Sequence, residues 1–583
     1  MKKKLLILLT LMFFTPFAVN AYEVKMDWQK SYDIAGNPYF TKDGGIIVLS
    51  DNYDSIQDDY DCIITKYDKE GNMLWKKNWG GNSYDAFRTM LLTEDDGVIV
   101  YADSHSTDIE DITYLGGADI VLIKYDKDGN VLWQKNWGGN NQDDFFSMLV
   151  IEDGGFIAVG YTNSTDIEGL PNKGEYVPVI VKFDKNGNVL WQKNWYGFGS
   201  FDSVEQTEDG GFIAVGSSTL NDIEGLTNKG ESDAIIVKYD KDGNMLWQKS
   251  WGGNKSDDLN NVIETEDGNI MLFGYSESTD IEGLPNKGDE AAIILKYDKD
   301  GNMLWQKKSW GGNDEDWINS ALLTDDGGFI LFGSSNSINI EGIMNHGSFD
   351  AIIARYDKDG NMLWQKSWGG NDEDWINSAL LIDDGGFILF GSSNSTNIEG
   401  IMNHGSFDAI IARYDKYGNM LWQKNWGGSE NDGFISMSLT EDGGFIGICE
   451  SFNLEQTNFD IKIVKYSIEY ELENVTNEKG TSIVQQQGKY GVITPTPNKG
   501  YEVDKVIIKD KDGNVLNVEV SKLEDGTYSF DLYTDVSVEV IYKEAIENPK
   551  TGILDVITII FVGLFISLSG FFIVKRYNER LEF

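Results

Sequence analysis

The sequence has very few cysteine, histidine and arginine residues for its length. Only Cys62 and Cys449 occur among 583 residues, so no disulfide framework can hold the fold together. Of the three histidines, His346 and His404 occupy the same position in two nearly identical segments. Because a catalytic general base belongs to a unique site, a duplicated histidine is a poor candidate for that role.

Positive charge is also scarce. The chain carries 48 Lys and Arg against 95 Asp and Glu, a formal net charge of −47 that is spread along its whole length. Nucleic acids and anionic lipids both require a basic surface, so neither is expected as a partner. No glycine-rich phosphate loop and no nucleophile elbow is present. These absences predict a non-enzymatic protein that has no resident cofactor.

What the sequence does contain is one recurring stretch, clearest at residues 123–139, I-K-Y-D-K-D-G-N-V-L-W-Q-K-N-W-G-G. Its first tryptophan recurs with gaps of 58, 58, 56, 58, 59 and 58 residues, and a shorter copy lies at Trp28. The full copies are at Trp75, Trp133, Trp191, Trp247, Trp305, Trp364 and Trp422. Such a period indicates a stacked supersecondary unit, because one unit cannot bury its own faces.

Each repeat can be divided into four short strands, which we name A to D. One copy has A at 131–137, B at 145–151, C at 156–161 and D at 179–183. Turns rich in Gly and Asn separate B from C and D from the next A. The D strands are continuous apolar runs that suit the interior of a sheet, whereas the A strands interleave polar residues and suit an exposed edge.

The strand count predicts a closed ring over residues 22–467. Strands A, C and D each occur eight times; the array begins with an A strand around Trp28 and ends on a D strand at 461–466. A last blade made of B, C and D lacks its edge strand, which the N-terminal strand can supply. We therefore predict an all-β, eight-bladed β-propeller rather than an open solenoid. Cys62 and Cys449 would then be neighbours, either disulfide-bonded or as two buried, unreactive thiols.

The pattern Asp126-x-x-Gly129-x-x-x-Trp133 resembles the tryptophan-docking repeats of quinoprotein-like and outer-membrane-assembly propellers. The fuller pattern, W-G-G-N followed by D-G-G-F-I, resembles the propeller-repeat surface proteins of Gram-positive bacteria. The resemblance implies that the tryptophan packs between adjacent blades, at Trp75, Trp133, Trp191, Trp247, Trp305, Trp364 and Trp422. Quinoprotein dehydrogenases commonly have a vicinal cysteine pair, which this chain lacks. Sialidases have an arginine cluster around the axis, whereas this array has only Arg88, Arg355 and Arg413.

Two acidic patterns raise the question of calcium. Asp-x-Asp-Gly-Asn is similar to the start of an EF-hand loop, but a tryptophan strand follows at once and further ligands are missing, so a hairpin turn is expected. A second acidic position lies six residues after the second tryptophan, at Asp85, Asp143, Asp257, Asp316, Asp374 and Asp432. These carboxylates are expected to accept backbone N–H groups. The alternative is weak calcium binding in richer loops such as 314–316.

The two ends of the chain carry targeting signals. Three lysines, an apolar run and small residues before position 22 predict a signal peptide at 1–21. Residues 468–543 alternate as short strands and resemble the small all-β modules that form stalks in bacterial surface proteins. A linker with the motif N-P-K-T-G follows at 544–552, then an apolar segment at 553–574 that is long enough to be a transmembrane helix, and a basic cytoplasmic tail at 575–583.

This C-terminal order resembles an LPxTG-like sorting signal, formed here by Asn548, Pro549, Lys550, Thr551 and Gly552. The resemblance implies that a sortase cuts after the threonine and joins it to peptidoglycan, which places the protein on the cell wall. Asparagine stands where the commonest form has leucine, which implies a sortase of different preference. The alternative is a single-pass anchor in the cell membrane.

The remaining expectation is ligand recognition. The longest loops join C to D, as at 162–176, and should cluster on one face of the propeller, where loops on a rigid scaffold usually bind. Trp317 and Trp375 either stack on sugar rings or fill the blades. Unit four departs most from the repeat, at 195–199. We expect a surface protein that binds a protein or glycan ligand by adhesion; the alternatives are a propeller enzyme acting on surface polysaccharide and a passive spacer.

Overall fold

The computed structural model describes residues 23–545, except for short internal gaps at 33–35, 55–58, 118, 173, 196, 220–225, 285–289, 309–311, 313, 383, 441, 454–457, 471, 476, 511–512, 517 and 533–534. The described chain divides into two compact units, Met1–Ile468 and Glu469–Phe583. The predicted signal peptide, sorting motif, membrane segment and tail lie outside the described residues. Within the described part, no helix is both long and apolar enough to cross a membrane.

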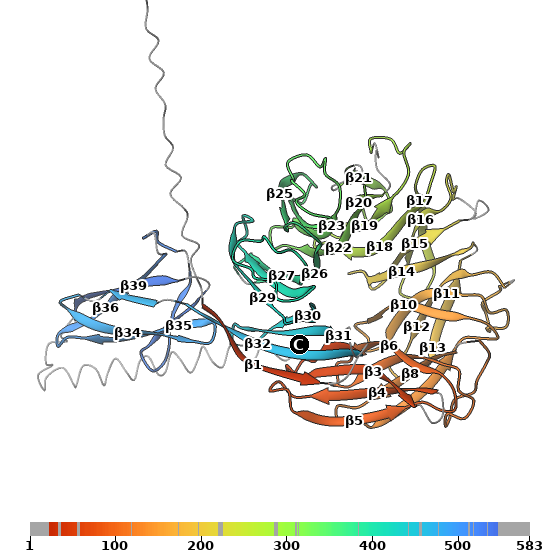
Figure 1. Ribbon diagram of the computed structural model, residues 1–583, viewed down its shortest axis with the longest axis horizontal. Helices are drawn as coiled ribbons and strands as arrows, with labels where there is room; N and C mark the ends of the chain where they lie inside the picture. Colours follow the sequence, from red (N-terminus) through yellow and green to blue (C-terminus); the bar gives the residue numbers. More distant parts are fainter. Residues whose placement is uncertain are drawn as a thin grey trace, which may run out of the picture. The chain divides into compact units, whose positions relative to one another are not determined.

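The first unit is an eight-bladed β-propeller, as predicted. Each blade is a four-stranded antiparallel sheet, and Figure 1 shows the blades following one another around a ring in chain order. Blades 1 to 4 consist of β2 (Asn37–Phe40), β3 (Ile46–Asp54), β4 (Asp59–Tyr67) and β5 (Met73–Trp79); β6 (Asp85–Leu92), β7 (Val98–Ser104), β8 (Asp119–Tyr125) and β9 (Val131–Trp137); β10 (Asp143–Val150), β11 (Phe156–Thr162), β12 (Val177–Phe183) and β13 (Val189–Asn194); β14 (Gly199–Gln206), β15 (Phe212–Ser218), β16 (Asp233–Tyr239) and β17 (Met245–Trp251).

The remaining blades repeat this plan, and the last one closes the ring. Their strands are β18 (Asp257–Glu264), β19 (Ile270–Ser276), β20 (Ala291–Tyr297) and β21 (Met303–Lys308); β22 (Asp316–Leu323), β23 (Phe329–Ser335), β24 (Asp350–Tyr356) and β25 (Met362–Trp368); β26 (Asp374–Leu381), β27 (Phe387–Ser393), β28 (Asp408–Tyr414) and β29 (Met420–Trp426); β30 (Asn431–Leu439), β31 (Phe445–Asn453), β32 (Asn458–Glu469) and β1 (Glu23–Tyr32). The predicted closure by the N-terminal strand is therefore confirmed.

The apolar runs of strands C and D form the core, which lies between the blades. In β8, β12 and β16 every residue is buried, while the outer A strands β9 and β17 begin with two exposed residues and end on a buried tryptophan. One hydrophobic cluster joins Ile99 and Tyr101 of blade 2 to Phe145 and Phe156 of blade 3. Each blade therefore buries its faces against its neighbours, which explains why a single repeat could not fold alone.

Both cysteines are buried, and they are thiols rather than the two halves of a disulfide. The disulfide alternative is thus wrong, and the expectation of two buried thiols is confirmed. Burial raises the pKa of the Cys449 thiol well above its ordinary value, so this group is a poor nucleophile.

The second unit is a small all-β domain with its own core. A three-stranded sheet contains β33 (Leu472–Val475), β39 (Val536–Glu544) and β36 (Tyr501–Lys509), and a four-stranded sheet contains β34 (Gly480–Gln487), β35 (Tyr490–Pro497), β38 (Tyr528–Asp531) and β37 (Val520–Lys522). Ile493, Phe530 and Val538 are among the residues buried between these sheets. Buried residues alternate with partly buried ones along most of β39, which matches the period of two seen in its sequence.

Candidate binding site at the inner rim of the propeller

The predicted docking tryptophans pack against the turn between strands D and A of the next blade. The Trp75 indole lies so close to Gly129 that a Cβ there would be 2.7 Å from the ring, and its Nε1 donates to the Lys127 carbonyl at 3.0 Å. The equivalent pairs, at 2.6–2.9 Å, are Trp133 with Gly187, Trp191 with Gly243, Trp247 with Gly301, Trp305 with Gly360 and Trp364 with Gly418. Trp422 is buried and stacks on Phe445.

A second tryptophan contact was not foreseen from the sequence. The last tryptophan of an A strand donates from Nε1 to the glutamine that follows the docking tryptophan of the next blade, as from Trp137 to Gln192 Oε1 at 2.8 Å. Four further pairs do the same: Trp79 with Gln134, Trp251 with Gln306, Trp368 with Gln423 and Trp426 with Gln29. The recurrence of W-Q-K could have indicated this contact, because the glutamine always follows the docking tryptophan. The last pair extends this contact across the ring closure.

The Asp-x-Asp-Gly-Asn segments are hairpin turns, as expected. In the copy at Asp126, the Oδ1 atom accepts the N–H groups of Asp128 and Asn130 at 2.9 and 2.8 Å, and Gly129 adopts a φ of 77°. These hydrogen bonds hold the pKa of the Asp126 carboxyl below its ordinary value, with the Asn130 side chain as the main cause. The Asp126 carboxylate therefore makes its hydrogen bonds within its own turn.

The second acidic position has the structural role that was predicted. In each copy the carboxylate is at most 3% exposed and accepts the N–H of the second glycine of W-G-G at 2.7–2.9 Å, for Asp85, Asp143, Asp257, Asp316, Asp374 and Asp432. Hydroxyls from the end of strand C complete the set, such as Ser395 Oγ at 2.7 Å from Asp374. Among the described residues, no group of three or more His, Cys, Asp and Glu side chains is arranged to hold a metal ion.

The residue next to this aspartate lies on what we call the inner rim. Strand B of each blade is on the inner side of the ring in Figure 1, and its start pairs with the end of strand C, where the C-to-D loop leaves. Around the ring the inner rim consists of Ala86, Asp144, Ser200, Asp258, Trp317, Trp375 and Gly433, placed by their register with strand C. The residue at this position of strand B therefore varies in size, charge and aromatic character around the ring.

Blades 6 and 7 make the inner rim aromatic. Trp317 and Trp375 are half-buried and stack with ring centroids 6.0 Å apart, and Phe349 lies 5.4 Å from the first and 4.7 Å from the second. Trp317 also donates from Nε1 to Glu290 Oε2 at 2.5 Å. The two tryptophans therefore neither fill a blade interior nor stand free, and with Phe349 they form a half-buried aromatic stack.

A pocket of about 360 Å³ opens beside this aromatic surface, between blades 7 and 8. Its apolar wall includes Trp375, Phe407 and Phe452, and its polar groups include Asn377, Ser392, Asn431 and Glu450. Glycine at position 433 supplies no side chain where the preceding blade has Trp375, and this difference helps to leave the space open. An apolar wall with a few convergent polar groups is the usual composition of a small-ligand site.

Blades 4 and 5 carry a pair of acidic residues, of which Asp258 belongs to the inner rim and Asp202 lies two residues after the blade 4 rim residue Ser200. The carboxyl groups of Asp202, on β14, and Asp258, on β18, are within hydrogen-bond reach of each other. Burial, and then repulsion from Asp202, raises the pKa of Asp258 to about 7, and burial also raises the pKa of Asp202. Two carboxylates this close cannot both ionise easily, so the pair holds one proton near neutral pH.

We expect this pair to make the stability depend on pH. Between about 4, the pKa of a free Asp, and about 7, the folded chain retains a proton that the unfolded chain releases, so stability falls as the pH rises through this window. Asp258→Asn should therefore leave the Tm at pH 5 nearly unchanged and raise it at pH 8, in thermal unfolding followed by fluorescence.

The matched control is Asp326→Asn. The Arg355 hydrogen bond lowers the pKa of Asp326 to about 2, so this carboxylate is ionised in both states above pH 5. Its loss should lower the Tm by the same amount at pH 5 and pH 8. A Tm change for Asp258→Asn that is equal at the two pH values would contradict the assignment of its raised pKa.

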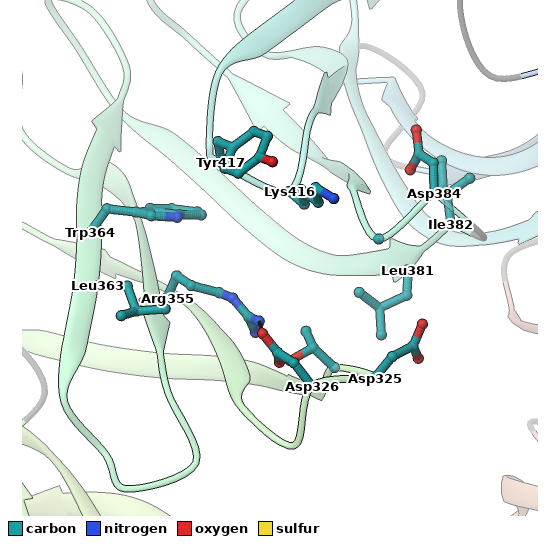
Figure 2. A pocket seen from close by; sticks show the side chains of 12 residues that line it. Asp325, Asp326, Arg355, Leu363, Trp364, Leu381, Ile382, Asp384, Lys416 and Tyr417 are labelled. Atoms are coloured by element: carbon teal, nitrogen blue, oxygen red, sulfur yellow. Dashed lines mark hydrogen bonds and ion pairs between the residues drawn. The ribbon is translucent and has the colours of Figure 1, made fainter. Parts of the chain in front are cut away.

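A larger pocket, of about 600 Å³, lies between blades 6 and 7 among the B-to-C and D-to-A turns (Figure 2). Trp364 and Tyr417 lie on one side, and the Arg355 guanidinium reaches Asp326 at 2.6 Å. That ion pair recurs in all eight blades, for example between Lys124 and Asp95 at 2.7 Å. Asp326, Arg355 and Asp384 are thus already paired within the blades, and the other charged groups that line the pocket are Asp325 and Lys416.

No protein-family profile matches the chain. Among curated proteins, the regulatory protein FlaEY of Caulobacter vibrioides is 24% identical over 237 residues, which are 38% of this chain and 25% of that protein. A WD repeat-containing protein of Acanthamoeba polyphaga mimivirus is 28% identical over 158 residues, which are 24% of this chain and 11% of that protein. The chain thus spans a quarter or less of the length of these relatives.

Solved structures also resemble the chain. The β-propeller domain of the Trilobed protease from Pyrococcus furiosus is 11% identical, with 68% of this chain and 97% of that chain covered and a TM-score of 0.36. The crystal structure of a eukaryotic initiation factor is 8% identical, with 89% and 93% covered and a TM-score of 0.40. At such identities these likenesses concern the propeller fold alone.

Proposed function

We propose that the chain is a cell-surface protein whose propeller binds a glycan, without catalysis, at the aromatic part of the inner rim. The observation that carries this proposal is the stack of Trp317, Phe349 and Trp375 beside the pocket between blades 7 and 8. Sugar rings present apolar C–H faces that suit aromatic surfaces, and amide, hydroxyl and carboxylate groups such as those of Asn377, Ser392 and Glu450 suit sugar hydroxyls.

The surface location rests on the sequence pattern at the two ends. A signal peptide at 1–21 would export the chain, and the motif from Asn548 to Gly552 before an apolar segment would make it a substrate for a sortase. Joining of Thr551 to peptidoglycan would leave the propeller outside the cell, with the small β-domain as the stalk. A high negative charge without basic patches suits solubility on a crowded surface.

We expect Trp375→Ala to weaken glycan binding about tenfold or more, because it removes one face of the stack and one wall of the pocket. The measurement is a glycan array with residues 22–545, followed by titration calorimetry on any saturable ligand. Tyr417→Ala is the matched control, since it removes an aromatic group that lines the other pocket. Equal loss of affinity in both variants, or unchanged affinity in Trp375→Ala, would contradict this site.

The acidic pair supports a second candidate, an enzyme that acts on surface polysaccharide. A carboxyl group with a pKa of about 7, as at Asp258, can donate a proton at neutral pH, and Asp202 is its direct neighbour. This function requires turnover: fragments should be released from a polysaccharide panel by the wild-type chain and not by Asp258→Asn. Binding without any product would leave the non-enzymatic proposal.

A further inference from the structure

Glu450 lines the pocket between blades 7 and 8, and its place in the repeat can be compared with that of Asp103 in blade 2. Glu450 lies on β31 opposite Gly433, and Asp103 lies on β7 opposite Ala86, so each pairs with the inner-rim residue of its blade. The residues opposite the rest of the inner rim are Tyr161, Ser217, Tyr275, Ser334 and Ser392. Blades 2 and 8 are therefore the two that place a carboxyl group at this position of the inner rim.

Blade 2 supplies its own cation to this carboxyl group, and blade 8 does not. Arg88, the bulge residue of β6, donates from Nε to Asp103 Oδ2 at 2.6 Å, and the Tyr101 hydroxyl lies 2.7 Å from Asp103 Oδ1. The bulge residue of β30 in blade 8 is Ile435, which lines the pocket. Blade 8 thus keeps the acidic residue but has an apolar side chain where blade 2 has the guanidinium.

No other positive charge takes the place of the missing guanidinium. Among the described residues that line the pocket there is no Lys, Arg or His, and the second acid, Asp432, is paired with Lys462 at 3.4 Å. Lys462 also donates to Ser451 at 2.8 Å, and Glu450 has no ion pair within the described part of the chain. Burial raises the pKa of Glu450, as it does for a carboxyl group that loses water without gaining a cation.

The other walls of the pocket suit an ammonium group. Trp375, Phe407 and Phe452 line it, and the negative faces of aromatic rings attract cations. Asn431 Oδ1, also in the lining, is buried and has no hydrogen-bond partner among the described residues. An ammonium group has three N–H donors, so it can satisfy this oxygen and compensate the Glu450 charge together.

We propose that this pocket binds a sugar with a free, protonated amino group, which forms an ion pair with Glu450. The inference rests on the proposed glycan function and narrows it to cationic amino sugars. The ammonium would stand to Glu450 as the Arg88 guanidinium stands to Asp103. An N-acetylated sugar carries no charge at this position, so it leaves the carboxylate uncompensated. The net charge of −47 also favours a cationic glycan over an acidic one.

The test compares two ligands that differ in this charge. A glucosamine disaccharide and its N-acetylated form are titrated into residues 22–545 by calorimetry, in a buffer that keeps the amino groups protonated. The amine should bind about tenfold more tightly, and added salt should reduce the difference. Equal affinities, tighter binding of the acetylated form or no binding of the amine would overturn the inference. A glycan-array ligand lost in Trp375→Ala would in each of these cases still support the proposed function.

Two variants and a matched control locate the charge. Glu450→Gln should abolish the preference for the amine, and Ile435→Arg should weaken amine binding about tenfold, because it restores the guanidinium that blade 2 has. The control, Asp325→Asn, removes one exposed carboxylate that lines the other pocket and should leave the preference unchanged. An equal loss in Glu450→Gln and Asp325→Asn would overturn the inference, since net charge alone would then attract the amine. An unchanged Tm shows that Glu450→Gln is folded.

Discussion

Deletion of residues 22–32, which removes β1, is expected to lower the Tm on the order of 10 °C and to cause self-association. The reason is that β1 completes the last blade beside β32. Without it, the apolar β32 residues Ile461 and Ile463 lie next to an unpaired edge, and Trp426 loses its hydrogen-bond acceptor Gln29. Differential scanning calorimetry and light scattering after gel filtration measure the two effects.

A synthetic peptide of residues 22–34, added in trans, should restore part of the lost stability because it can occupy the same edge. The control is Gln29→Ala in the full chain, which removes the closing hydrogen bond and keeps the strand; its cost should be about 1 kcal/mol. A deleted chain that remains monomeric with an unchanged Tm would show that β1 does not close the ring.

Gly129→Ala is expected to destabilise the propeller by about 3 kcal/mol or more, since two effects combine. Gly129 has a φ of 77°, which costs an alanine about 1 kcal/mol, and the new Cβ would lie 2.7 Å from the Trp75 ring. The indole would have to leave its place against the turn and give up its hydrogen bond to Lys127. Thermal and urea unfolding of the variant report the loss.

Gly154→Ala isolates the first effect, the backbone strain. Gly154 has nearly the same φ, 79°, but nothing lies within 4 Å of an added Cβ. It should therefore cost only the backbone strain of about 1 kcal/mol. If the two variants were equally destabilised, packing of the tryptophan on the next blade would contribute nothing to stability.

Much of the propeller could be predicted because the sequence patterns of its strands recur from blade to blade. The A strand predicted at 131–137 is β9 itself, and the predicted closure at Trp28 is the observed one. Strand D was predicted to start at 179 but begins at Val177. Pro178 has no N–H group, yet it pairs with Tyr161 inside the sheet. The side chain of Val177 is buried, and this burial stabilises the longer strand.

The candidate site could be predicted only in part, because it depends on which blades lie side by side. Trp317 and Trp375 were noted as extra aromatic residues, but their stacking with Phe349 requires a C-to-D loop residue from the same face. Asp258 is equivalent to Ser200 of blade 4, two residues before Asp202, so no sequence period relates the two aspartates. Burial then sets their pKa values, and burial cannot be read from spacing.

The closure of the ring also has a mechanical consequence. The chain enters the propeller on β1 and leaves it on β32, and the second unit begins at Glu469, the last residue of β32. A pull on that unit is therefore transmitted along β32, which lies in the interior of its sheet between β31 and β1. A strand loaded along its own axis must break both hydrogen-bond ladders together in shear, rather than peel away one bond at a time. The blade that completes the ring is thus also the blade through which a pull on the second unit acts.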